Sequence, residues 1–208
     1  MKSKISSIIL IVIGAFAVIF AAGAFVYNSV AESRRYDDAV SAVAKIMESI
    51  PEVEERVPSE RGNNMMPSLE IDGTNYVALV EFPTYRFVMP VVSTWHSSYI
   101  DSVPCRYQGS VYDNTLAIGS SDEEGQMRFA EELEVGDFMY LTDMSGGKYR
   151  FAVEAIHHSD EISEERLAQG DFDLTIFVKS SGNSEYLLIR CNSEMSANNE
   201  FANQENQE

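Results

Sequence analysis

The sequence predicts a mainly β protein, a closed β-barrel of about eight short strands with short helical insertions, preceded by an apolar N-terminal helix. Residues 67–191 alternate between short runs rich in β-branched and aromatic residues and turn signals of Gly, Asn and Asp. The hydrophobic fraction, 45% of 208 residues, is sufficient for one core. Residues 5–27 carry no charge.

The chain is strongly acidic, with a formal net charge of −18 at pH 7. Nucleic acids and anionic lipid headgroups would both repel it, so neither is expected as a partner. The simplest role of the excess acid is solubility.

The uncharged run 5–27 predicts a transmembrane signal-anchor. A bilayer core of about 30 Å needs about 20 helical residues, whereas a cleavable signal peptide has an apolar region of about 7–15. A small-residue segment at 29–31 keeps cleavage open as an alternative. Lys2 and Lys4 favour a cytoplasmic N-terminus, residues 1–4, and an extracellular domain; Arg34 and Arg35 weaken that signal.

The segment 28–66 predicts a helix followed by a polar linker. Asn28 to Ile50 has helical periodicity and ends before Pro51. Its expected apolar stripe, which would pack on the following domain or on a partner helix, consists of Val40, Val43, Met47 and Ile50. The barrel domain is expected at 67–191, and the Asn-, Glu- and Gln-rich segment 192–208 is expected to be a disordered tail.

Within the barrel domain, eight segments have strand character. They are Leu69–Ile71, Tyr76–Glu81, Phe87–Val92, Leu116–Ile118, Phe138–Thr142, Tyr149–Ile156, Leu174–Lys179 and Tyr186–Cys191. Turn signals join several of them into hairpins, namely Asp72-Gly73, Ser145-Gly146-Gly147 and Gly182-Asn183. Short helical segments are expected at 127–133 and 162–168.

The last hairpin, 173–191 with the sequence DLTIFVKSSGNSEYLLIRC, resembles the catalytic hairpin of sortases. These are cysteine transpeptidases of Gram-positive cell surfaces, and in a branch near class B the region reads roughly DLTLFTCT-GG-SRVTVRC. The resemblance extends back to Leu69 through an ordered set of segments. They are EIDG with Tyr76, MPVV with Trp95, PCRYQGS at 104–110, 116–121, 133–137, Thr142-Asp143 with Gly146, and GDFDLT at 170–175. It implies a sortase-type barrel for 67–191.

The same resemblance implies that the catalytic residues of a sortase are missing. The family's nucleophilic Cys falls on Lys179, its Arg on Tyr186, and its His on Ser121, or on Ser120 if the alignment shifts by one residue. A lysine forms no thioester, a serine does not shuttle protons near neutral pH, and a tyrosine carries no positive charge. The expected protein has a sortase fold without sortase chemistry. It would bind a sorting-signal-like peptide, a surface protein or pilin, or a working sortase.

An active sortase with a displaced site is the alternative. Cys191 and Arg190 are the candidates for a rebuilt site, with His96, His157 or His158 recruited as the base. Strand alternation places Tyr186, Leu188 and Arg190 on one face and Leu187, Ile189 and Cys191 on the other. Arg190 is more simply expected to pair with a surface acid.

The remaining candidates have simple structural explanations. Cys105 and Cys191 are either two buried thiols or a disulfide in an oxidising exterior. Lys179 is a solvated strand-end lysine, unless burial makes it a base, a nucleophile or part of an isopeptide bond. The acidic runs 122–124 and 159–165 lack the ligand spacing of a calcium loop. No cofactor and no metal site is predicted.

Overall fold

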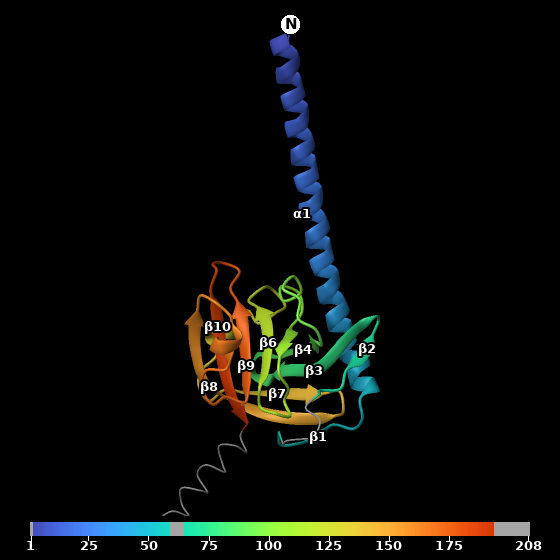
Figure 1. The fold of residues 1–208 in the computed structure, drawn as a ribbon. Coiled ribbons are helices and arrows are strands. Elements are labelled where there is room, and N and C mark those ends of the chain that lie inside the picture. The colour runs from blue at the N-terminus through green and yellow to red at the C-terminus, as the bar shows by residue number, and fades with distance from the viewer. Residues whose placement is uncertain (1, 59–64, 194–208) are drawn as a thin grey trace, which may run out of the picture.

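The computed structural model describes residues 2–58 and 65–193 and forms a β-barrel with one long helix beside it (Figure 1). The helices are α1 Lys2–Ser49 and α2 Glu164–Leu167, with 3₁₀ turns η1 Pro83–Tyr85 and η2 Ala130–Glu132. The strands are β1 Glu54–Glu55, β2 Leu69–Ile71, β3 Thr74–Phe82, β4 Phe87–Val92, β5 Cys105–Gln108, β6 Leu116–Ser121, β7 Phe138–Asp143, β8 Gly147–Ser159, β9 Leu174–Lys179 and β10 Tyr186–Ser193.

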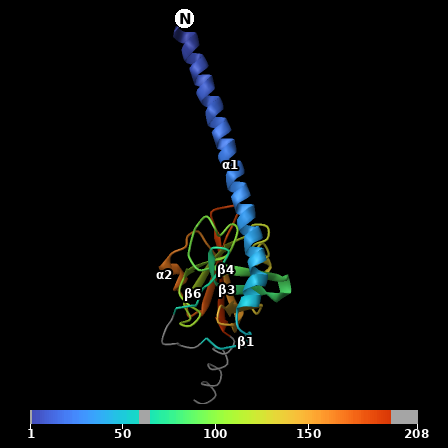
Figure 2. The same cartoon turned by 90° about the vertical axis from the view of Figure 1, so that its right-hand side faces the viewer.

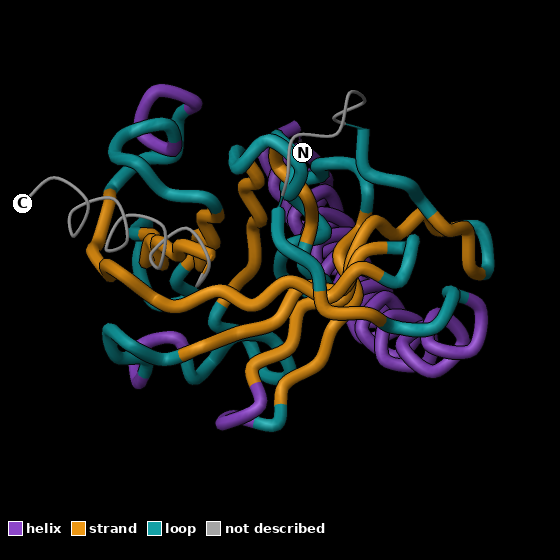
Figure 3. The backbone as a smooth tube through the Cα atoms, turned by 90° about the horizontal axis from the view of Figure 1, so that it is seen from below, coloured by secondary structure: helices purple, strands orange, loops and turns teal. Residues whose placement is uncertain are grey.

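Eight of these strands close into a mixed barrel. The hydrogen-bonded order runs β8-β10-β9-β6-β5-β4-β3, and β7 pairs with both β3 and β8 to complete the ring. Most neighbours are antiparallel, but β6 pairs with β9, and β4 with β5, in parallel. Figure 3 shows the strands from below, with the loops around them. The predicted closed, mainly β barrel is confirmed.

The barrel has a core inside and a smaller apolar cluster outside. Along β10, Leu187, Ile189 and Cys191 belong to the main core. Leu188 and Tyr186 belong to the outer cluster, with Ala117 on β6 and Phe177 on β9. The alternation expected from the sequence is therefore confirmed, and the outer cluster marks a second packed surface on the face of β6, β9 and β10.

α1 is a single helix of 48 residues, and its C-terminal part packs against β4 and β2 (Figure 2). Its buried positions are Ala39, Ala42 and Ile46, whereas Val40 and Met47 are 46% and 53% exposed. Of the predicted stripe, Val43 and Ile50 pack against the core, but Val40 and Met47 do not, because the small side chains of the two alanines let the helix approach the sheet on that side.

The predicted anchor falls within α1, whose N-terminal part projects away from the barrel (Figure 1). Of the residues in this run, the side chains of 5–13, 15, 16, 25 and 26 lie outside the described part of the chain. Across the residues that are described, no helix combines the length and the apolar character needed to cross a membrane.

The segment expected to be a linker contains β1, which pairs in parallel with the start of β8. The backbone N–H of Glu54 donates to Gly146 O at 2.9 Å, and that of Arg56 to Lys148 O at 2.8 Å. At the other end, β10 continues to Ser193, and residues 194–208 of the predicted tail lie outside the described residues.

A buried carboxylate fixes the β7–β8 hairpin. Asp143 is 0% exposed, and its side chain accepts hydrogen bonds from the hydroxyls of Tyr112 at 2.6 Å and Tyr149 at 3.0 Å. It also accepts bonds from the backbone N–H groups of Ser145 at 2.8 Å and Gly147 at 2.9 Å. These bonds organise the turn whose Gly146 has a φ of 80°.

Candidate functional site: an aromatic groove beside Lys179

The three residues that the sequence placed at the sortase catalytic positions lie side by side across three strands. Ser121, the last residue of β6, is the register partner of Lys179 at the end of β9. Lys179 is in turn the partner of Tyr186 at the start of β10. In-register neighbours point to the same face of a sheet. The three positions therefore form one row at the end of the outer face, although Ser121 is far from the other two in sequence.

The row contains an ion pair at the position where the family resemblance places the nucleophilic thiol. The ammonium of Lys179 donates to both carboxylate oxygens of Asp101, at 2.9 and 3.0 Å. The two side chains are 39% and 27% exposed. Lys179 is thus a half-buried, paired residue rather than the solvated strand-end lysine that the sequence favoured. The ion pair with Asp101 therefore fixes the position of the Lys179 side chain in this row.

The two serine positions are closed to ligands. Ser121 is 1% exposed and accepts a long hydrogen bond from the backbone N–H of Glu123, at 3.5 Å. Ser120 is 0% exposed and donates to the side-chain oxygen of Gln126 at 3.3 Å. Gln126 in turn donates to Ser102 O at 2.7 Å. Both serines therefore serve packing and local hydrogen bonding.

Four aromatic side chains lie together on the outer face next to Lys179 and form what we call the aromatic floor. Trp95 meets Tyr107 edge-to-face with a centroid separation of 5.0 Å, and Phe177 lies 5.6 Å from Trp95 and 5.4 Å from Tyr107. Tyr186 extends the group, at 6.1 Å from Phe177. Such edge-to-face contacts are favourable and hold the rings in a fixed arrangement.

The glycine at position 119 of β6 makes this floor possible. A Cβ there would lie 2.6 Å from Cζ3 of Trp95 and 2.7 Å from Cζ of Phe177. Any side chain at 119 would push both rings outward, so the close approach requires glycine.

An open groove of about 610 Å³ runs over this floor. Its lining combines the aromatic rings with Lys179 and a polar wall, and consists of Trp95, Ser97, Ile100, Tyr107, Asp160, Glu161, Ile162, Phe177, Lys179, Ser184 and Tyr186. A neighbouring hollow of about 630 Å³ shares Trp95 and Tyr107 and continues along β5 to Asp113. Together they offer an extended path across the outer face.

α1 contacts both loops that flank the row. A guanidinium nitrogen of Arg35 donates to Ser98 O at 3.4 Å, and the guanidinium lies 5.2 Å from the ring centroid of Tyr99 in the loop that carries Asp101. Tyr36 packs against Gly125 in the loop after β6, so closely that a Cβ at 125 would lie 2.4 Å from its ring. α1 therefore packs directly against the two loops that border the site.

Arg190 and Cys191 do not join the row. Arg190 is 1% exposed and donates to Leu167 O and Arg166 O, both at 2.6 Å, and to the Thr175 hydroxyl at 2.8 Å. It caps the end of α2 instead of pairing with a surface acid, so that expectation is wrong. Cys191 is 0% exposed and belongs to the inner core, the face opposite to Tyr186.

Both cysteines are free buried thiols. Burial raises the pKa of the Cys105 thiol to about 12 and that of Cys191 still further. A thiol attacks as its thiolate, so neither group is activated in this fold.

The three histidines lie in different surroundings. His96 stacks on Tyr99 at 4.6 Å, with Nδ1 2.9 Å from the Ser98 hydroxyl. His157 is the register partner of Leu188, and burial together with Arg190 and Arg166 lowers its pKa. His158 is the register partner of Leu187, and its Nε2 lies 3.9 Å from a carboxylate oxygen of Glu131. The backbone of His96 forms a hydrogen bond with the Cys105 thiol, but this contact does not involve the imidazole ring.

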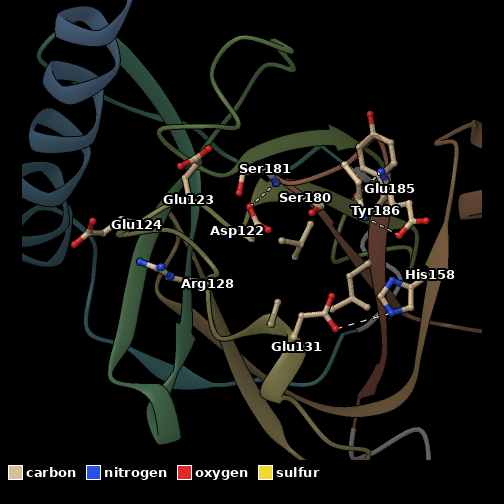
Figure 4. A pocket seen from close by; sticks show the side chains of 14 residues that line it. Asp122, Glu123, Glu124, Arg128, Glu131, His158, Ser180, Ser181, Glu185 and Tyr186 are labelled. Carbon is tan, nitrogen blue, oxygen red and sulfur yellow. Dashed lines mark hydrogen bonds and ion pairs between the residues drawn. The ribbon is translucent and has the colours of Figure 1, made fainter.

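A second cavity, of about 430 Å³, opens at the end of the barrel (Figure 4). Its rim is acidic and includes Asp122, Glu123, Glu124, Glu131 and Glu185. Asp122 accepts a hydrogen bond from the backbone N–H of Ser181 at 2.7 Å and so ties the β9–β10 turn to the loop after β6. Within the described residues, no group of three or more His, Cys, Asp or Glu side chains is arranged to hold a metal ion.

Comparison with known proteins identifies the class of fold. No protein-family profile matches the sequence, and no curated protein matches it. Among solved structures, sortase A from Corynebacterium diphtheriae aligns with a TM-score of 0.51 and 18% identity, over 58% of this chain and 61% of that protein. The chain therefore spans about three fifths of that protein's length.

Two further sortases align equally well. Sortase C1 from Streptococcus agalactiae has a TM-score of 0.51 and 17% identity over 60% of this chain and 70% of its own. Sortase C-3 from Streptococcus pneumoniae has a TM-score of 0.51 and 13% identity over 78% of this chain and 82% of its own. The barrel is a sortase fold. These neighbours belong to classes A and C, so the sequence-based placement near class B has no support from them.

Sequence reasoning found the row but missed Asp101. A single aspartate in a loop, 78 positions from its lysine, has no local pattern that predicts the pair. Trp95 and Tyr107 belong to motifs of the family resemblance, but their contact depends on Gly119 and Phe177 on neighbouring strands.

Proposed function

We propose that this protein is a sortase-fold binding protein without transpeptidase activity, which holds an extended peptide segment of a surface protein in the outer groove. The observation that carries the proposal is the Lys179–Asp101 ion pair in the row where the family resemblance places the nucleophile. The groove beside the row supports it, since the aromatic floor offers binding surface without a reactive group.

Membrane attachment is part of the proposal and rests on the sequence. The uncharged run 5–27 is long enough for a signal-anchor, and the basic residues Lys2 and Lys4 favour a cytoplasmic N-terminus. The barrel and its groove would then lie outside the cell. Val18, Ile19 and Phe20, within this run, are 69%, 69% and 80% exposed, which supports burial of the helix in another environment.

The alternative is an active cysteine transpeptidase that uses Cys191. It requires a thiolate from a fully buried thiol on the inner face, and the barrel would have to open for a substrate to reach it. No observation favours this route over the binding function.

One assay separates the two functions. Full-length protein in detergent is incubated with a sorting-signal peptide and then analysed by intact mass for a thioacyl adduct. We expect no adduct and no cleavage. An adduct that disappears in Cys191→Ala would overturn the binding-only proposal.

A Lys179→Cys variant provides the positive control for access to the groove. A thiol at 179 would be half exposed, so iodoacetamide should label it in the folded protein, while Cys105 and Cys191 should react only after unfolding. Binding is measured separately through Trp95, the only tryptophan of the chain. Absence of any peptide-induced change at Trp95 would count against peptide binding in this groove.

A further inference from the structure

We infer that the groove selects peptides carrying a lysine or arginine side chain next to an apolar residue. This inference rests on the proposed peptide-binding function and adds a charge preference to it. It comes from the distribution of fixed charges around the aromatic floor.

The charges along the groove leave an excess of acid. Lys179 is neutralised by Asp101, its partner at 2.9 Å. Two further acids, Asp160 and Glu161, line the groove and share one cation, Arg166, which lies outside the lining at 3.9 Å from Asp160 and 3.5 Å from Glu161. The groove lining itself thus carries two acids and one cation, and when the paired Asp101 and Arg166 outside the lining are included, three acids meet two cations, so one negative charge remains.

The unsatisfied charge lies on the wall formed by the β8–β9 connection. Asp160 is 89% and Glu161 67% exposed at the side chain, so both can turn toward a ligand without losing buried contacts. The Arg166 pairs are long and exposed, and such pairs contribute at most about 1 kcal/mol. A ligand cation would find acceptors there at small cost.

The floor suits the stem of the same side chain. Tyr186, Trp95 and Ile162 line the same groove as Lys179, Asp160 and Glu161. Lysine and arginine lay their methylene stems on apolar surface while the charged head reaches polar groups. Aromatic rings also attract a cation that lies over their faces. An apolar neighbour of the basic residue would occupy the Trp95–Tyr107 end.

An anionic ligand is disfavoured for the same reasons. The only cation in the lining of the groove is already paired, and the molecule as a whole carries a net charge of −18. Repulsion from the remaining charge opposes a second carboxylate in the groove.

The test titrates full-length protein in detergent with two capped peptides at physiological salt. One peptide alternates Leu and Lys, and the matched control peptide alternates Leu and Gln. Binding is measured by the change in Trp95 fluorescence. We expect the Lys peptide to bind about tenfold more tightly, and D160N/E161Q to abolish the difference. The control variant E131Q/E132Q removes the same number of charges from exposed positions of η2 and should keep it.

Each outcome bears on a separate claim. Equal binding of both peptides would overturn the charge preference and leave the proposed peptide binding intact. Equal losses in D160N/E161Q and E131Q/E132Q would also overturn it, because overall charge would then explain the effect. No fluorescence change with either peptide would count against the binding function itself.

Discussion

Asp143 is the residue on which the β7–β8 hairpin most depends. Burial alone would raise the pKa of its carboxyl, but hydrogen bonds from Tyr112, Ser145 and Gly147 outweigh burial and hold the pKa below its ordinary value of 3.8. Unlike an exposed aspartate, it therefore stabilises the folded state through its charged form.

Asp143→Asn should destabilise the protein by about 3 kcal/mol, because an amide has one acceptor oxygen where the carboxylate has two, so some of the buried donors lose their acceptor. Urea unfolding measures the change. Asp171→Asn, at an exposed position, is the control and should shift the free energy by less than about 0.5 kcal/mol. A small effect at 143 would mean that the hairpin does not need the charge.

The same residue predicts a pH dependence. Because the pKa of Asp143 is lower in the folded than in the unfolded protein, its stabilising contribution is complete above the unfolded pKa, about 3.9. The contribution declines as the pH falls through the folded pKa. The stability difference between wild type and Asp143→Asn should be constant from about pH 5 to 8 and shrink below about pH 4.

Which residues form the site could be predicted from the sequence only where a motif indicated them. The resemblance assigned Ser121, Lys179 and Tyr186, and the structure brings these three together. Asp101 and the burial of Arg190 followed from no local signal, because both depend on contacts between segments distant in sequence. The expectation of a solvated Lys179 failed for that reason.

At the scale of elements, the strands were more predictable than the contacts of α1. Strand β4 matches its expected bounds, and β9 does as well. The two-residue β1 is polar and is fixed only by pairing with β8, so its sequence predicts a linker. The buried face of α1 uses alanines, which a search for large apolar residues passes over.

The face of α1 can be tested with adjacent residues. Ile46 is 0% exposed, so Ile46→Ala should cost about 2–4 kcal/mol through lost burial and a cavity. Met47 is 53% exposed, and Met47→Ala should change the free energy of unfolding by less than about 0.5 kcal/mol. Chemical denaturation of both variants gives the answer, and a larger loss at 47 would restore the face expected from the sequence.

Arg190 joins α2 to the last hairpin. Its guanidinium is buried, which lowers its pKa, and its bonds go to the neutral oxygens of Arg166, Leu167 and Thr175. Arg190→Met preserves much of the side-chain volume but removes the donor to these oxygens, so residues 160–173 should open more often, at a cost of about 2 kcal/mol.

Amide hydrogen exchange of 160–173 measures this effect. The control is Arg166→Met, which breaks only exposed ion pairs and should cost less than about 1 kcal/mol. Unchanged exchange in Arg190→Met would show that α2 is held by other contacts.

For the whole molecule, the sequence predicted the closed barrel because eight strand signals and an ordered set of motifs agreed. It could not predict which strands close the barrel, because β7 pairs with β8, its neighbour in sequence, and also with the distant β3.

The proposed topology is a property of the whole molecule and predicts where the C-terminus lies. An alkaline phosphatase fused after residue 208 should be active outside the cell, and a β-galactosidase fused there should be inactive, because the anchor leaves only residues 1–4 inside. Replacing Ile11 and Val12 with Lys should impair membrane retention. The reverse enzyme pattern would place the groove in the cytoplasm.

The continuity of α1 has a consequence for the reach of the protein. A helix rises about 1.5 Å per residue, so the step from Tyr27, the end of the proposed anchor, to Arg35, which bonds the Asp101 loop, is about 12 Å. Because the helix is continuous, it would hold the site at this fixed distance from the end of the proposed anchor. A partner would have to present its binding segment within this short height above the bilayer, which favours partners that are themselves tethered to the same membrane.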